Sequence, residues 1–211
     1  ILRLGYPAAI EQSMGALTVT VITVLAATFG TLALASYGIV FRIMTFVVIP
    51  TYGISMATSI LLGQNLGAGD VSSARRIAVA AATLGFTLMG TAGVCLFIAA
   101  ESIAGIFAPG DPQLIEHCAL VLRIFVLGFP LSGIQMAMYG AFRGAGATMS
   151  ALVLTLTGIW VIQMPLCVVL SQYTALGEMG LWWSSFIAAT VNTLIAVIYF
   201  RSNRWQGKPA S

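Results

Sequence analysis

Charged side chains are what this sequence has least of. Only 7% of its 211 residues are Asp, Glu, Lys or Arg, whereas 59% are hydrophobic, and the mean hydropathy is +1.01. About a quarter of the residues in a typical soluble domain are charged. The scarcity excludes a soluble globular protein, and it argues against a nucleic-acid partner although the sequence pI is near 9.0.

The sequence also lacks the residue patterns of catalysis. Its single histidine, His117, excludes an HExxH zinc site, and the sequence contains no G-x-S-x-G and no Walker A motif. Cys95, Cys118 and Cys167 have no CxxC spacing and are expected to be buried free thiols. We therefore predict no enzyme activity, no metal site and no cofactor. Any transport would be driven by an ion gradient or by the substrate itself, because the sequence holds no nucleotide-binding domain.

Long apolar runs fill most of the chain, and each holds at least 22 residues. At about 1.5 Å per helical residue, that length crosses a hydrocarbon core of roughly 30 Å. We predict an all-α integral membrane protein in which residues 1–211 form a single lobe of six transmembrane helices. The expected spans are residues 6–29, 37–62, 77–100, 118–142, 148–170 and 179–200.

The basic residues between these runs predict the orientation in the membrane. Seven Lys or Arg residues fall on one side of the predicted spans and none on the other, although the second side carries acidic residues. Because cytoplasmic loops are enriched in Lys and Arg, both termini are expected to be cytoplasmic. The same residues are expected to contact anionic lipid headgroups. They are Arg3, Arg75, Arg76, Arg143 at the start of the fourth loop, Arg201, Arg204 and Lys208.

Proline and glycine predict where helices bend and where they approach each other. Pro50 and Pro130 lie near the middle of two spans, and bends are expected there because proline removes a backbone hydrogen bond. Such bends either serve packing alone or line a cavity, as in transporters. The spacing of Gly140 and Gly144 would allow close helix contact. Asp70 is expected to cap a helix that starts at Val71.

One carboxylate, Glu11, lies inside an apolar run. A charge at membrane depth is costly, so it is a functional candidate by default. Glu11 is about six residues, roughly 9 Å, from the predicted cytoplasmic start of its helix. It is therefore either a shallow residue facing water or a proton, cation or substrate site in a cleft. Gln12 beside it points about 100° away around the helix.

Two arginines and several neutral polar residues also lie within the predicted spans. Arg42 is expected either to extend to the outer headgroups or to face an aqueous vestibule, whereas Arg123 is expected to reach the headgroups. The neutral polar residues either form hydrogen bonds between helices or line a pathway, and they are Ser132, Gln135, Gln163 and Asn192. The candidates for a substrate or ion pathway are Glu11, Gln12, Arg42, Ser132, Gln135 and Gln163.

A family resemblance rests on four segments. The sequence Gly-Gln-Asn-Leu-Gly-Ala-Gly-Asp at 63–70, followed by Ala74-Arg75, closely resembles the signature loop of the multidrug and toxic compound extrusion (MATE) family. Three more segments fit the same family at matching intervals: Arg-Leu-Gly-Tyr-Pro at 3–7, Phe-Arg-Gly-Ala-Gly-Ala-Thr at 142–148, and Trp160 followed by Pro165-Leu166. The resemblance covers essentially the whole chain.

The resemblance implies both an architecture and an activity. Members of the family have twelve helices in two lobes around a central cleft, and this chain looks like the C-terminal lobe without the N-terminal lobe. It implies export of organic, often cationic compounds across the cytoplasmic (inner) membrane in exchange for H⁺ or Na⁺. The implied partners are small organic substrates, membrane lipids and the N-terminal lobe.

This sequence departs from the norfloxacin-efflux branch of the family. Gly15 and Ser132 stand where that branch has the two carboxylates of its cation site. Glu11 lies one helical turn before Gly15. Either Glu11 is a displaced substitute for the missing carboxylate, or the protein belongs to a DinF-like branch that couples transport to the ion through the other lobe. Two functions other than drug export are also compatible with the sequence. A flippase for lipid-linked oligosaccharides would need a more cationic cavity, and a non-transporting scaffold subunit would need no cavity.

Overall fold

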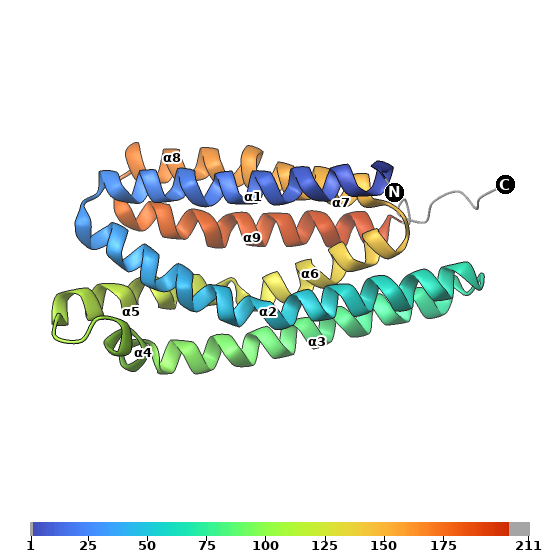
Figure 1. The fold of residues 1–211 in the computed structure, drawn as a ribbon, viewed down its shortest axis with the longest axis horizontal. Helices are drawn as coiled ribbons and strands as arrows, with labels where there is room; N and C mark the ends of the chain where they lie inside the picture. The colour runs from blue at the N-terminus through green and yellow to red at the C-terminus, as the bar shows by residue number, and fades with distance from the viewer. Residues whose placement is uncertain (1, 203–211) are drawn as a thin grey trace.

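The computed structural model describes residues 2–202, except for the side chains of residues 2–5, 7 and 8, and every regular element in this range is a helix (Figure 1). Arg3, Arg204 and Lys208 lie outside the described side chains. The elements are α1 (Leu2–Thr28), α2 (Thr31–Gly67), α3 (Val71–Ile98), α4 (Ala100–Phe107), α5 (Pro112–Leu127), α6 (Phe129–Gly144), α7 (Thr148–Leu156), the π-helix η1 (Thr157–Gln163), α8 (Met164–Gln172) and α9 (Glu178–Arg201).

Five helical stretches are long and apolar enough to cross a membrane, and the bent pair α5–α6 makes a sixth if it counts as one span. The all-α membrane fold expected from the sequence is therefore confirmed. The helix ends differ from the expected ones: α2 runs from Thr31 to Gly67 rather than over 37–62. The stretch 101–117, expected to be a connection, contains α4 and the start of α5. In α4, Ala100 and Ala104 are buried while Ile106 is 75% exposed.

The helices form two layers (Figure 1). One layer holds α1, α7, α8 and α9, and the other holds α2 to α6. The start of α1, the end of α9 and the connections α2–α3 and α6–α7 lie at one end of the bundle, which we call the basic end. The opposite, acidic end holds the connections α1–α2, α4–α5 and α8–α9. Among the residues whose side chains are described, four arginines belong to the basic end and four carboxylates belong to the acidic end. These residues are Arg75, Arg76, Arg143 and Arg201, and Glu101, Asp111, Glu116 and Glu178.

Glycine allows α6 to pack directly against the backbone of α2. A Cβ atom added at Gly140 would collide with the carbonyl oxygen of Ser55, and one at Gly144 would collide with that of Ser59. The close approach expected from the Gly140–Gly144 spacing is thus confirmed. The contact fixes how α6 is rotated about its axis, and that rotation decides which of its side chains face the interior.

The helix breaks follow proline. The axes of α5 and α6 meet at 45° around Gly128, two residues before Pro130, so the bend expected there is confirmed. The helix α2 continues through Pro50 and changes direction along its length (Figure 1). The π-helix η1 ends two residues before Pro165. Proline cannot donate to the preceding turn and its ring crowds a carbonyl there, and a wider turn relieves both problems. The sequence did not predict this π-helix.

The connection between α2 and α3 carries the signature loop. Gly69 has φ +79°, a left-handed conformation that suits glycine. Asp70 accepts a 2.9 Å hydrogen bond from the backbone N–H of Ser73, so the expected N-cap is confirmed. Hydrogen bonds from Ser73 and Ser72 lower the pKa of Asp70 to about 2. The cap therefore stays charged at any physiological pH.

Two buried clusters hold the layers together. Near the acidic end, the Trp182 ring of α9 stacks on Tyr37 of α2 with centroids 5.6 Å apart. Near the basic end, Phe142 of α6 meets Tyr199 of α9 edge to face at 5.2 Å. Between these two clusters, Thr193 Oγ1 of α9 donates to the Leu131 carbonyl of α6 at 3.2 Å.

Candidate functional site

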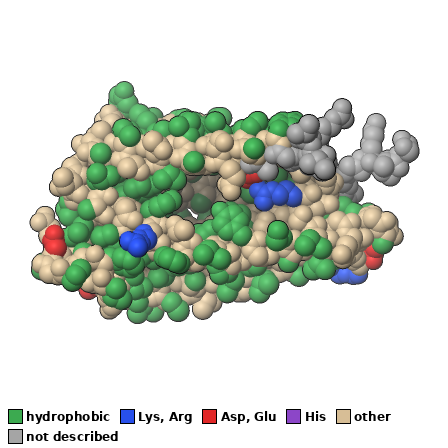
Figure 2. Space-filling model, viewed as in Figure 1, with side chains coloured by type: hydrophobic (Ala, Val, Ile, Leu, Met, Phe, Trp, Pro, Cys, Tyr) green, Lys and Arg blue, Asp and Glu red, His purple; other side chains and the backbone are tan. Residues whose placement is uncertain are grey.

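The face shown in Figure 2 is hollowed between the two layers, with basic and acidic side chains side by side at the edge of the hollow. Two cavities of about 250 and 320 Å³ occupy the interior here. Their walls share Gln163, Ser185 and Ala189, so the cavities adjoin. We call them the polar chamber and the apolar chamber.

The polar chamber is built from α1, α6, α7, η1 and α9, and six side chains with polar atoms converge on it besides Ser185. Gln135 Nε2 donates to the Tyr139 hydroxyl at 2.9 Å, and Gln163 Nε2 donates to Ser185 Oγ at 3.2 Å. The six are Glu11, Gln135, Tyr139, Thr155, Gln163 and Asn192. Such a wall can bind a hydrated ion or the polar part of an organic molecule.

Glu11 supplies the carboxylate of this chamber, and it is paired. Arg143 Nη2, in the last turn of α6, donates to Oε1 at 2.8 Å and to Oε2 at 3.0 Å. Thr155 Oγ1 of α7 also lies 3.3 Å from Oε1. The Glu11 side chain is 19% exposed and that of Arg143 is 36% exposed. The pair is thus largely removed from solvent, where attraction between charges is stronger than at an open surface.

The π-helix shapes the wall opposite Glu11. Gly158 of η1 faces Asn192 of α9 so closely that a Cβ atom would collide with the Asn192 amide group. Asn192 is 6% exposed, and its Oδ1 atom has no hydrogen-bond partner among the described residues. A buried acceptor without a partner costs free energy.

The apolar chamber lies between α1, α2, α5, α6, η1 and α9. Aromatic and aliphatic side chains dominate its wall, including Tyr37, Phe41, Phe125 and Phe129, while Ser132 adds a hydroxyl. Ser132 Oγ donates to the Phe129 carbonyl at 2.8 Å within its own helix. This chamber therefore suits the apolar body of a ligand whose polar part reaches the neighbouring chamber.

Four of the six candidate residues lie in the two chambers. Glu11, Gln135 and Gln163 line the polar chamber, and Ser132 and Gln163 line the apolar one. Gln12 and Arg42 are exposed, and neither is part of either wall. Arg42 makes no hydrogen bond or ion pair with any residue in the described part of the chain.

Arg123 was expected to reach the lipid headgroups, but in the structure it pairs with other residues of the protein. Its Nη2 atom donates to Glu101 of α4 at 2.9 Å, and its guanidinium lies 5.7 Å from the centroid of the Phe97 ring. The sequence did not predict these partners. The interaction ties α5 to α3 and α4 at the acidic end and lies away from both chambers.

Sequence reasoning missed Arg143, Tyr139 and Thr155 as site residues. Arg143 was assigned to a loop as a topology signal, but α6 continues to Gly144 and holds its side chain against α1. A signal was present, because Gln135, Tyr139 and Arg143 recur every four residues and so share one helix face. Thr155 carries no comparable pattern.

Comparisons with known proteins show the family and the fold of this chain. The chain matches the MatE family over residues 7–169. A probable multidrug resistance protein NorM of Thermotoga maritima is 30% identical over 209 residues, which is 98% of this chain and 44% of that protein. The solved structure of the MATE transporter ClbM in complex with Rb⁺ superposes with a TM-score of 0.90 at 22% identity, over 97% of this chain and 48% of that one. A crystal structure of MATE in the bent conformation gives a TM-score of 0.89 at 22% identity over 96% and 44%. This chain thus spans less than half the length of these proteins.

Proposed function

This chain belongs to the MatE family, and we propose that the protein it comes from exports drugs or other toxic organic compounds across the cytoplasmic membrane. The relative from Thermotoga maritima, named as a probable multidrug resistance protein, supports this activity. We further propose that the chain is one six-helix lobe, the C-terminal one, of a twelve-helix transporter. The 44% share of the relative's length supports this view, as does the position of the start of α1 and the end of α9 at the same, basic end.

The observation that carries the proposal is the pair of adjoining chambers with one carboxylate in the polar part. An amphiphilic cation would place its apolar body among the aromatic rings of the apolar chamber. Its charged or hydrogen-bonding part would reach Gln163 and Ser185 at the junction and Glu11 beyond them. A weakly specific apolar wall with few fixed polar groups can accept many compounds of this type.

Coupling to an ion gradient follows from competition for Glu11. In this structure the carboxylate is neutralised by Arg143. A proton or Na⁺ that reaches the carboxylate replaces part of this attraction, and Arg143 is then less strongly held to α1. One carboxylate cannot neutralise two cations at once. An entering organic cation and the coupling ion (H⁺ or Na⁺) therefore compete for Glu11. That competition is the thermodynamic basis of exchange.

Glu11→Gln in the full-length protein tests this proposal, because it keeps the shape of the side chain and removes its charge. We expect ion-driven export of a cationic dye from liposomes to fall at least about tenfold, with expression and membrane insertion unchanged. The matched control is Glu101→Gln, which removes a carboxylate of the exposed pair with Arg123 and should leave export intact. Normal export by the Glu11 variant across a range of pH would place the coupling site in the other lobe.

An oligosaccharide flippase is less well supported, because its anionic pyrophosphate would need positive charge in the cavity. The arginine beside the polar chamber, Arg143, has its charge offset by Glu11, and Arg42 lies outside both walls. We also propose that the basic end, with Arg75 and Arg76, faces the cytoplasm. A cysteine at position 75 should then be labelled by membrane-impermeant reagents only after the cells are opened.

A further inference from the structure

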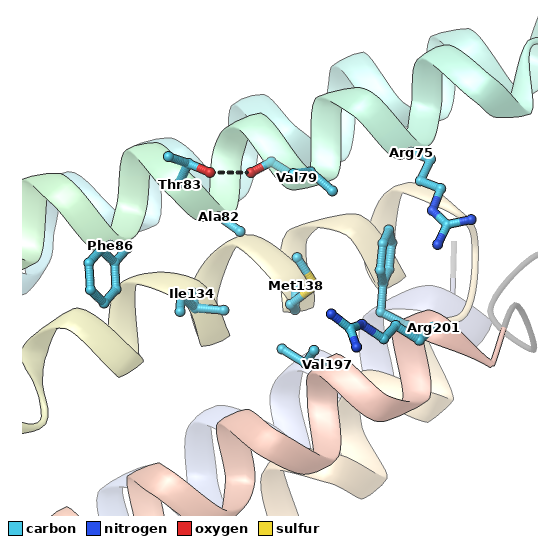
Figure 3. A pocket seen from close by; sticks show the side chains of 10 residues that line it. Arg75, Val79, Ala82, Thr83, Phe86, Ile134, Met138, Val197 and Arg201 are labelled. Atoms are coloured by element: carbon cyan, nitrogen blue, oxygen red, sulfur yellow. Dashed lines mark hydrogen bonds between the residues drawn. The ribbon is translucent and has the colours of Figure 1, made fainter.

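A third cavity lies on another side of the bundle, as a groove of about 370 Å³ between α3, α6 and α9. It shares no lining residue with either chamber. In Figure 3, these three helices lie in front of α1 and α2, so the groove opens away from the hollow. The transport proposal makes no use of it.

Two arginines stand at one end of the groove. Arg75 belongs to the start of α3 and Arg201 is the last residue of α9, and both are exposed. Their guanidinium groups reach from opposite walls toward the space between the helices (Figure 3). Neither makes an ion pair or a hydrogen bond with a residue in the described part of the chain. The neighbouring Arg76 differs, since it donates to Ser73 Oγ at 2.6 Å and is not part of the groove.

The rest of the groove is lined by apolar side chains and by Thr83, whose hydroxyl donates to the Val79 carbonyl at 3.0 Å. Val79 and Phe86 of α3 are 52% and 47% exposed, and they face Ile134 and Met138 of α6 and Val197 of α9 (Figure 3). From Arg75 to Phe86 the wall runs eleven residues along α3, or roughly 16 Å. That length matches a large part of one acyl chain, and it leads from the basic end toward the middle of the expected bilayer.

We infer that this groove binds an anionic phospholipid. The headgroup phosphate lies between Arg75 and Arg201, which donate charge-assisted hydrogen bonds to its oxygens. One acyl chain lies along Val79, Ile134 and Val197. Charge complementarity favours this occupant. Two arginines without acidic partners among the described residues lie at the expected headgroup level, next to a wall in which Thr83 is the one polar side chain besides these arginines.

The experiment measures lipid binding to the purified full-length protein by native mass spectrometry, with phosphatidylglycerol and phosphatidylcholine as probes. Each basic residue contributes about fivefold to the affinity for an anionic headgroup. The double variant Arg75→Gln/Arg201→Gln should therefore bind phosphatidylglycerol about 25-fold more weakly, while phosphatidylcholine binding changes little. Arg76→Gln is the matched control and should behave like the unmodified protein.

A second variant tests the acyl part of the groove. Val79→Trp fills the groove from an exposed position without entering the core, and it should weaken phosphatidylglycerol binding while both arginines remain. Soluble glycerol 3-phosphate should not displace the bound lipid. Equal phosphatidylglycerol binding by the double variant and the Arg76 control would overturn the inference. Displacement of the bound lipid by glycerol 3-phosphate would also overturn it. So would a Val79→Trp variant that binds phosphatidylglycerol normally and differs only in its self-association. None of these readouts depends on export, so they separate this inference from the transport proposal.

Discussion

Two ion pairs at opposite ends of the bundle have the same chemistry and different surroundings. Arg143 meets Glu11 at 2.8 Å, and Arg123 meets Glu101 at 2.9 Å. The Glu11 side chain is 19% exposed, whereas that of Glu101 is 66% exposed. Since water screens the exposed pair and can solvate either partner alone, distance says little about the energy of these pairs. Burial is what makes the Glu11–Arg143 pair important.

A third interaction is at least as well shielded as the Glu11–Arg143 pair, because the side chains of His117 and Glu178 are 15% and 20% exposed. His117 Nε2 is 3.1 Å from Glu178 Oε1, and its Nδ1 is 2.8 Å from Ser36 Oγ, so α5 links α9 and α2 at the acidic end. Glu178 also accepts a 3.1 Å hydrogen bond from Trp182 Nε1. Unlike Glu11, this carboxylate lies beside a packed aromatic cluster and lines neither chamber. It serves to hold helices together.

The largest effect is expected when the arginine of each ion pair is replaced in turn. Arg143→Gln leaves the Glu11 carboxylate largely buried without its cation. We expect a loss of about 2 kcal/mol in the free energy of unfolding, below the value for a fully buried pair because Arg143 is about one-third exposed. Thermal unfolding of the purified protein, followed by tryptophan fluorescence, measures the loss. Arg123→Gln is the control, and an equal loss in both variants would contradict the role given to burial.

The double variant Glu11→Gln/Arg143→Gln refines this test. Removing both charges leaves no uncompensated carboxylate, so the double variant should be more stable than Arg143→Gln alone. A double variant as unstable as the sum of the two single variants would show that Glu11 and Arg143 do not interact.

Removing His117 should give an intermediate effect, because both of its partners keep another hydrogen bond. His117→Ala removes one partner from Ser36 and one from Glu178, although Ser36 keeps the Leu32 carbonyl and Glu178 keeps Trp182. We expect a loss of about 1 kcal/mol in unfolding free energy. The same thermal unfolding measurement applies, with the exposed neighbour Glu116→Gln as control. A loss larger than that of Arg143→Gln would reverse the order proposed here.

The smallest effect is expected at the exposed pair. Glu101→Gln should change the unfolding free energy by no more than about 0.5 kcal/mol, because exposed ion pairs contribute little and are weakened by salt. Measuring this variant at low and high salt checks the explanation. A large loss that persists in high salt would mean that Glu101 and Arg123 are better shielded than their exposure indicates.

Local features of the sequence predicted much of the fold. The length of the apolar runs predicted the membrane helices, Pro130 predicted the bend between α5 and α6, and Asp70 predicted the cap of α3. Each of these effects depends only on residues close by in the sequence. The sequence did not predict those features that depend on packing against residues distant in the chain. The helix α4 lies in a stretch that was too short for a span, and η1 depends on how the turn before Pro165 packs against Asn192.

The candidate site was predictable only in part. Glu11, Gln135 and Gln163 were recognised because polar groups in an apolar run are costly. Their assembly into one chamber was not, and Arg42, equally unusual in the sequence, lies outside it. A helix can be rotated so that a polar residue faces the interior or the exterior, and hydropathy along the chain does not record that rotation.

The sequence by itself determined that this protein lies in a membrane, which segments are apolar enough to cross it and which connections carry the basic residues, because hydrophobicity and charge act along the chain. Only the tertiary structure decided which residues meet. Glu11 and Arg143 are 132 positions apart, and Arg75 and Arg201 come from different helices. Such contacts depend on helix rotation, which is set by close packing at positions such as Gly140 and Gly144 rather than by the polar residues that it brings together.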